Sequence, residues 1–84
     1  MSYHLFILPR AQKVLEKLPV DIYERLRDDI RFLSVDPRPC GCKKLVARNG
    51  WRIRVNKYRV VYEIDDKKRT VTVLDIGQRK DIYH

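Results

Sequence analysis

Cysteine is scarce in this chain of 84 residues: the only two, Cys40 and Cys42, are separated by a single glycine. That spacing is poor for an unstrained disulfide, and no further cysteine completes a zinc site. We therefore expect two reduced thiols in a loop, no metal centre and no cofactor. The sequence also lacks a carboxylate pair, a Gly-rich phosphate loop or a Ser/His/Asp arrangement that would indicate other chemistry.

Long apolar runs are absent as well. No window approaches the roughly 18 apolar residues that a membrane-spanning helix needs. The first eight residues lack the basic start and long apolar run that mark a secretory signal. We therefore expect a cytoplasmic protein without a membrane segment. Hydrophobic residues make up 44% of the chain, which permits a packed core. The length suits one small domain, predicted to span residues 1–84.

Acidic residues are in the minority. There are 19 Lys and Arg against 11 Asp and Glu, which gives a formal net charge of +8. Such a balance favours a polyanionic partner, either nucleic acid or an acidic protein. Charge alone does not decide between them.

The hydrophobic pattern predicts an α+β fold. Residues 3–8 form a short apolar strand, and Pro9 is suited to the first turn of a helix. Two helical stripes follow, separated by Pro19: Ala11, Val14, Leu15 and Leu18, then Ile22, Leu26, Ile30 and Leu33. After a turn-rich segment come strands within residues 51–62 and 69–76. The expected order is an N-terminal strand, a two-helix hairpin and a three-stranded antiparallel meander, with the helices packed on one face of the sheet. Both faces of the last strand are partly apolar, so its buried face is left open.

The most informative segment is the hairpin at residues 51–62, with its loop at Asn56-Lys57. This loop places three apolar pairs on one face: Trp51 with Tyr62, Ile53 with Val60, and Val55 with Tyr58. For Trp51 and the tyrosines, core packing is favoured over stacking on a base. Arg52, Arg54 and Arg59 then share the open face, with Arg54 directly opposite Arg59. Like charges in such positions destabilise a sheet by up to roughly 1 kcal/mol. The arrangement therefore indicates an anionic ligand, and phosphate is the natural match for guanidinium groups.

The tail adds further candidates. The last strand runs antiparallel to the middle one, so its end should lie near Arg59 and bring Arg79 and Tyr83 to the same side. Cations without metal ligands or a protein nucleophile suit RNA, whose own 2′-hydroxyl attacks the adjacent phosphate. His84 is a candidate proton-transfer group, whereas His4 is expected to be structural.

These residues resemble the RelE/ParE toxin superfamily, the small basic toxins of type II toxin–antitoxin modules. The resemblance covers nearly the whole chain and is most specific in two runs, WRIRVNKYRVVYEID at residues 51–65 and GQRKDIY at residues 77–83. It implies a RelE-like fold and, for RelE-type members, a metal-independent, ribosome-dependent endoribonuclease. Such enzymes cut mRNA codons in the aminoacyl site, leave a 2′,3′-cyclic phosphate and so inhibit translation.

By this resemblance, Arg52 and Arg54 bind RNA and promote 2′-hydroxyl attack, and Arg59 stabilises the phosphate. Arg79 assists the leaving group, and Tyr83 stacks on the substrate. The further cations expected to bind RNA or the ribosome are Lys43, Lys44, Arg48, Lys57 and Lys80.

Two positions depart from the family pattern. Gln78 stands where many relatives have histidine, and the Tyr83-His84 ending reverses the His/Tyr order of another ribosome-dependent branch.

The implied partners are a cognate antitoxin in a hetero-oligomer, the ribosome and mRNA. Two alternatives are kept: a ParE-like inhibitor of DNA gyrase without nuclease activity, and a non-catalytic nucleic-acid-binding module. The full arginine and tyrosine set favours the nuclease.

Overall fold

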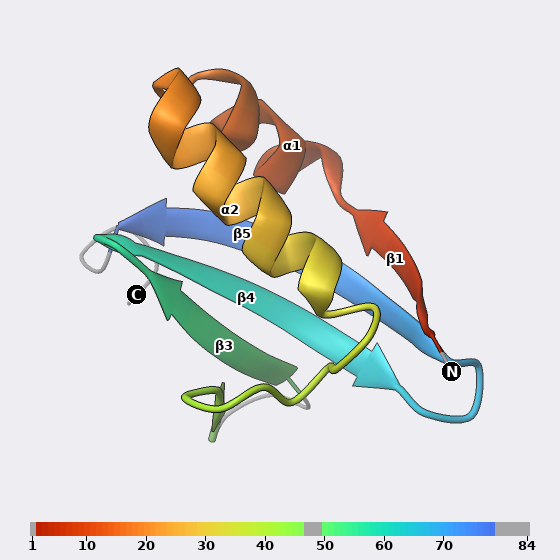
Figure 1. The fold of residues 1–84 in the computed structure, drawn as a ribbon. Helices are drawn as coiled ribbons and strands as arrows, with labels where there is room; N and C mark the ends of the chain where they lie inside the picture. Colours follow the sequence, from red (N-terminus) through yellow and green to blue (C-terminus); the bar gives the residue numbers. More distant parts are fainter. Residues whose placement is uncertain (1, 47–49, 79–84) are drawn as a thin grey trace.

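The computed structural model of the protein describes residues 2–46 and 50–78. Figure 1 shows two helices covering one side of a twisted sheet. The elements in chain order are β1 (His4–Ile7), α1 (Pro9–Glu16), α2 (Val20–Phe32), β2 (Lys43–Lys44), β3 (Gly50–Val55), β4 (Tyr58–Asp65) and β5 (Thr70–Gln78). The predicted α+β class and the two-helix hairpin on one face are confirmed.

Proline sets the boundaries of both helices. Pro9 is the first residue of α1, a position whose backbone N–H has no partner within a helix, so proline loses no hydrogen bond there. Pro19 lies directly before α2 and has an extended backbone, so α1 ends at Glu16 and the chain turns between the helices. The acidic Asp21 in the first turn of α2 complements the helix dipole.

The sheet has the order β1-β5-β4-β3-β2. Strands β3, β4 and β5 form the predicted antiparallel meander. Two features differ from the prediction. Strand β1 runs parallel to β5, so the sheet is mixed, and β2 adds a fifth strand beside β3. The direction of β1 was missed because one strand's pattern says nothing of its neighbour's direction. Strand β2 was missed because two exposed lysines carry no apolar alternation.

The core lies between the helices and the inner face of the sheet. Its buried helical residues come from the two predicted stripes: Ala11, Leu15, Leu26, Ile30 and Leu33. The sheet contributes the alternate positions of β3 and β4 together with parts of β5: Ile53, Val55, Val60, Tyr62, Val71, Val73 and Ile76. The helical stripes and the inner face of the hairpin are therefore confirmed.

A β-bulge explains why the buried face of β5 was ambiguous in the sequence. Val61 pairs with Asp75 whereas Tyr62 pairs with Val73, so Leu74 is an extra residue in β5. The bulge shifts the inward positions from odd to even numbers, and Val73 and Ile76 both reach the core. A strict period of two cannot describe such a strand.

Among the residues that the structure describes, no helix is long and apolar enough to span a bilayer.

Candidate nucleic-acid interface

The register of β3 and β4 is the predicted one. Arg54 lies directly opposite Arg59, and Arg52 lies opposite Val61. Because the alternate residues Ile53, Val55, Val60 and Tyr62 face the helices, these three arginines belong to the outer face of the sheet. The left-handed backbone of Asn56, with φ of 58°, closes the hairpin loop, as asparagine does readily.

Strand β2 adds a second like-charge pair. Lys43 lies directly opposite Arg52, so it shares the outer face. Two directly opposed cationic pairs, Lys43–Arg52 and Arg54–Arg59, therefore adjoin on three neighbouring strands. We call these four residues the cationic ladder. Like charges in directly opposite positions repel, and four cations gathered on one face favour an anionic ligand.

Exposure of the ladder is uneven, and here the expected open face needs correction. Arg54 and Lys43 are exposed and Arg52 is half-buried, but Arg59 is only 3% exposed. Arg59 has interaction partners in the structure. A cation so deeply placed has lost most of its water and is fixed in position. This arrangement suits a charge that must be positioned before a phosphate arrives.

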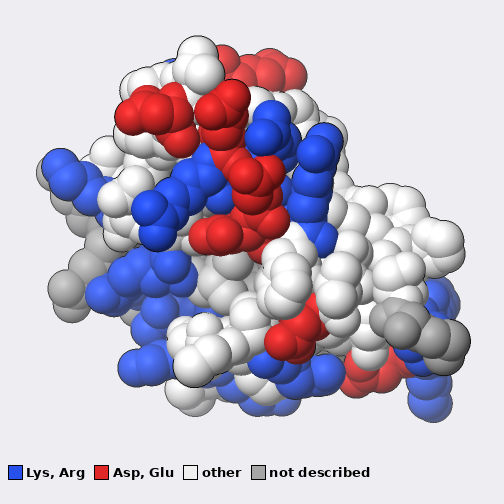
Figure 2. Space-filling view, in the orientation of Figure 1, with Lys and Arg blue, Asp and Glu red and all other residues white. Residues whose placement is uncertain are grey.

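Charge is distributed unequally over the molecule. Helix α2 carries four acidic and three basic side chains and so has a net charge of −1, although the whole chain has a net charge of +8. In Figure 2 acidic side chains gather over α2, whereas lysines and arginines predominate around the lower edge of the sheet. A polyanion is therefore attracted to the sheet rather than to α2.

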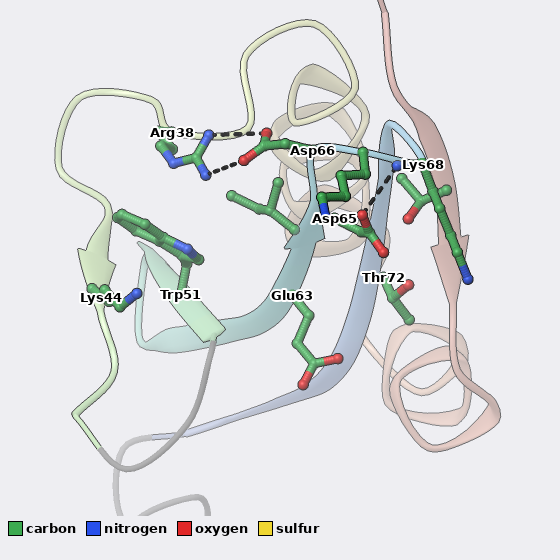
Figure 3. Close-up of a pocket in the computed structure, with 11 residues that line it drawn as sticks. Arg38, Lys44, Trp51, Glu63, Asp65, Asp66, Lys68 and Thr72 are labelled. Carbon is green, nitrogen blue, oxygen red and sulfur yellow. Dashed lines mark hydrogen bonds and ion pairs between the residues drawn. The ribbon is translucent and has the colours of Figure 1, made fainter.

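A cleft of about 650 Å³ opens beside β3 and the β4–β5 turn, and we call it the Trp51 cleft. Its lining includes Arg38, Lys44, Trp51, Glu63, Asp66 and Thr72. Figure 3 shows Arg38 and Asp66 pointing toward each other above the indole, with Lys44 beside it. The Arg38 guanidinium lies 5.1 Å and the Lys44 ammonium 5.6 Å from the centroid of the Trp51 ring, within cation–π range.

Arg38 and Asp66 hold one wall of this cleft. The guanidinium of Arg38 donates to both carboxylate oxygens of Asp66, at 2.9 and 3.4 Å, and the Tyr3 hydroxyl donates to the same carboxylate at 2.7 Å. The hydrogen bond from Arg38, followed by that from Tyr3, lowers the pKa of Asp66. The wall is also tied to the core, because the buried Tyr62 hydroxyl donates to the Pro37 carbonyl at 2.7 Å. Burial raises the pKa of Tyr62.

Several predicted site residues lie outside the described part of the chain: Arg48, Arg79, Lys80, Tyr83 and His84. Their predicted roles remain predictions. Lys57 is exposed in the β3–β4 turn, beside the Arg54–Arg59 end of the ladder. Lys44, by contrast, lies over Trp51 and not on the ladder, because neighbouring residues of a strand face opposite sides.

The loop thiols are as expected. Cys40 and Cys42 are both free, and Cys42 N–H donates to the Pro39 carbonyl in a turn that places Gly41 at φ of 93°. Within residues 2–46 and 50–78 there is no group of three or more His, Cys, Asp and Glu side chains that could hold a metal ion.

Sequence reasoning missed the Trp51 cleft. Arg38 and Asp66 are 28 positions apart, and no local pattern links them. Trp51 was expected in the core, and it does pack against the core, but it is only half-buried. The one available signal was the position of Trp51 at the start of its strand, where a side chain often remains partly open.

Comparisons with known proteins bear on the family and on the fold. A family model described as the ParE toxin of the type II toxin–antitoxin system parDE matches residues 5–83. Toxin RelG of Mycobacterium tuberculosis is 30% identical over 86 residues, covering 99% of this chain and 98% of its own length.

Solved structures are similar over almost the whole chain. The toxin–antitoxin complex RelBE2 from Mycobacterium tuberculosis matches with a TM-score of 0.82 and 28% identity, covering 94% of this chain and 100% of that one. The archaeal RelE–RelB complex from Pyrococcus horikoshii matches with a TM-score of 0.84 and 27% identity, covering 94% of this chain and 97% of that one. A mutant of E. coli toxin RelE in the free state matches with a TM-score of 0.81 and 27% identity, covering 98% of this chain and 88% of that one.

Proposed function

The chain belongs to the RelE/ParE toxin superfamily of type II toxin–antitoxin systems, and from this premise we propose that it is a ribosome-dependent mRNA endoribonuclease. The observation that carries the proposal is the cationic ladder. Lys43, Arg52, Arg54 and Arg59 form two directly opposed like-charge pairs on the outer face of the sheet. Four cations gathered in this way attract an anion, and the phosphates of an RNA strand supply one.

The proposed reaction uses the nucleophile of the substrate. The 2′-hydroxyl oxygen attacks the adjacent phosphorus, the new O–P bond closes a 2′,3′-cyclic phosphate, and the bond to the 5′-oxygen of the next nucleotide breaks. The proton of the 2′-hydroxyl passes to a base, and the departing 5′-oxygen takes one from an acid. Charge that develops on the phosphate oxygens is stabilised by fixed cations.

Each proposed residue has one part in this scheme. Exposed Arg54 and half-buried Arg52 draw in the RNA backbone, and buried Arg59 provides the positioned charge beside the reacting phosphate. From the tail, Arg79 assists the leaving group, Tyr83 stacks on the base, and His84 is a candidate for proton transfer. Lys43, Lys57 and the other cations near the ladder extend the electrostatic track toward mRNA or the ribosome.

The positive charge of the chain and the similar structures both favour an antitoxin partner. Three of the similar structures are toxin–antitoxin complexes from Mycobacterium tuberculosis, Pyrococcus horikoshii and E. coli. We expect a cognate antitoxin that forms a hetero-oligomer with this chain and presents acidic side chains to the ladder. Action on ribosomes places the toxin in the cytoplasm.

One observation favours a second function. The matching family model is that of the ParE toxin, so a ParE-like gyrase inhibitor is the competing hypothesis. A binding module without catalysis is the third.

The test is primer extension on translated mRNA after induction of the native chain and of Arg59→Ala. The nuclease predicts codon-phased cuts that disappear in the variant. Disturbed DNA supercoiling without such cuts would overturn the nuclease in favour of the gyrase hypothesis. Growth arrest that survives in a folded Arg59→Ala protein would count against the role proposed for Arg59.

A further inference from the structure

The Trp51 cleft combines an aromatic ring with cations at the edge of the cationic ladder. Strand β2 links the two: Lys43 lies opposite Arg52 on the outer face, and Lys44 lies opposite Trp51 on the inner face. Both lysines belong to an outermost strand of the sheet. A flexible polyanion bound along Lys43 and Arg52 can therefore pass over this edge of the sheet, and one or two of its repeating units further on it can reach Lys44 and Trp51.

We propose that the Trp51 cleft is a second nucleotide subsite, in which a base stacks on the Trp51 indole and the neighbouring phosphate binds Lys44. The ligand class is a single-stranded ribonucleotide segment. The proposal deepens the proposed RNA function, because the segment is continuous with RNA held on the ladder. Stacking on an aromatic ring beside lysine or arginine is the usual way in which proteins hold single-stranded RNA.

The shape and contacts of the cleft fit one nucleotide. Its volume of about 650 Å³ exceeds what a base and sugar need, and Trp51 is half-buried, so the indole is anchored in the core while part of its surface stays accessible. Lys44 is exposed, lies over the ring and forms no ion pair with any residue that the structure describes, so it can move from the ring to a phosphate at small cost. Arg38 lies over the same ring and is paired with Asp66, so these two side chains form the wall beside the base.

The acidic residues of the cleft bear on how the RNA backbone would enter it. Asp66 is engaged by Arg38 and Tyr3, and Asp65 accepts a hydrogen bond from the Lys68 N–H. Glu63 is exposed and lies on the opposite side of the cleft from Lys44 (Figure 3). A phosphate is repelled by Glu63, so the backbone should enter beside Lys44 and the base should point inward.

Trp51 is the only tryptophan of the chain, so its emission reports on this cleft alone. The native chain, freed of antitoxin, is titrated with a 2′-O-methyl RNA hexamer, which cannot be cleaved by 2′-attack. We expect saturable quenching that follows binding measured by anisotropy of a labelled hexamer. Inorganic polyphosphate, which has charge but no bases, should bind without comparable quenching. Hexamer binding with unchanged emission, or equal quenching by polyphosphate, would overturn the subsite.

Two variants sharpen the test. The logarithm of the affinity falls linearly with the logarithm of the salt concentration, and Lys44→Gln should make this slope shallower by about 0.7, the value for one phosphate contact to a single strand. Lys13→Gln on α1 makes the same charge change at an exposed position away from β2, and should leave the slope unchanged. If the two changes had equal effects, Lys44 would contribute only non-specific electrostatic attraction and no phosphate contact in the cleft. Trp51→Leu should weaken hexamer binding by about tenfold. Unchanged affinity in a folded Trp51→Leu protein would refute stacking.

Failure of the subsite and failure of the proposed nuclease are distinguishable. Quenching needs no cleavage, so a native chain that quenches but makes no codon-phased cuts retains the subsite and loses the nuclease. The source of the nucleotide is settled by ultraviolet crosslinking of the ribosome-bound toxin through Trp51. A crosslink on mRNA indicates a nucleotide that flanks the cut codon, a crosslink on ribosomal RNA indicates a docking contact, and a crosslink on neither counts against the subsite.

Discussion

The repulsion between Arg54 and Arg59 gives a prediction in which stability and activity move in opposite directions. Arg54→Thr removes one member of the directly opposed pair at an exposed position and introduces a residue that favours strands. The free energy of unfolding should rise while RNA cleavage is lost. The change is made at Arg54 because Arg59 is buried, and its removal would disturb packing as well as charge.

The magnitude follows from the register. Cβ atoms of directly opposite residues lie about 5 Å apart, and such a like-charge pair costs from a few tenths to about 1 kcal/mol. Because 1 kcal/mol shifts the Tm of a chain of this size by about 4–8 °C, the gain should reach a few degrees. Salt should diminish it, since the screening length falls from about 10 Å at 0.1 M to about 3 Å at 1 M.

The assay is urea unfolding of the native chain, Arg54→Thr and Arg54→Lys at 0.1 M and 1 M salt. Arg54→Lys keeps the charge and is the matched control, so its stability should equal that of the native chain. Primer extension on translated mRNA measures activity in parallel. If Arg54→Thr is less stable than the native chain, Arg54 contributes to folding, and the inference of a ligand from repulsion is refuted.

Three further predictions concern the framework of the site. Tyr62→Phe removes the buried hydrogen bond to Pro37 and leaves that carbonyl unsatisfied, so urea unfolding should show a loss of about 1–2 kcal/mol; an unchanged midpoint would contradict the bond. Asp66 has a lowered pKa, so its stabilising contribution is present above the ordinary carboxyl pKa and is lost as pH falls through the folded-state value. Asp66→Asn should therefore lower Tm at pH 7 and have less effect at pH 2, and a difference of the same size at both pH values would rule out the ion pair with Arg38. Leu26→Ala empties a fully buried position between the helix and the sheet and should cost about 2–5 kcal/mol in urea unfolding, whereas a loss below 1 kcal/mol would mean that α2 is not packed as described.

Much of the fold was predictable because its signals are local. The stripe of α2 reads directly from steps of three and four residues, and Leu26 and Ile30 are buried as expected. The hairpin register followed from one two-residue loop, which placed Arg54 opposite Arg59. The buried face of β5 stayed open for an equally definite reason, because the bulge at Leu74 breaks the period of two along that strand.

The candidate site divides in the same way. The outward direction of Arg52, Arg54 and Arg59 was fixed by alternation along two strands. The depth of Arg59 was not, since burial depends on what covers a side chain and not on the face that it occupies. The partnership of Arg38, Asp66 and Trp51 joins three segments, and no spacing rule connects them.

The sequence by itself therefore determined the helical stripes, the hairpin register and the opposed arginines, because each follows from the periodicity of one or two adjacent elements. Only the tertiary structure decided that β1 lies parallel to β5, that β2 sets Lys43 against Arg52, and that Trp51 opens into a cleft. These features depend on where distant segments meet in space, and that is settled by packing of the whole chain around its core.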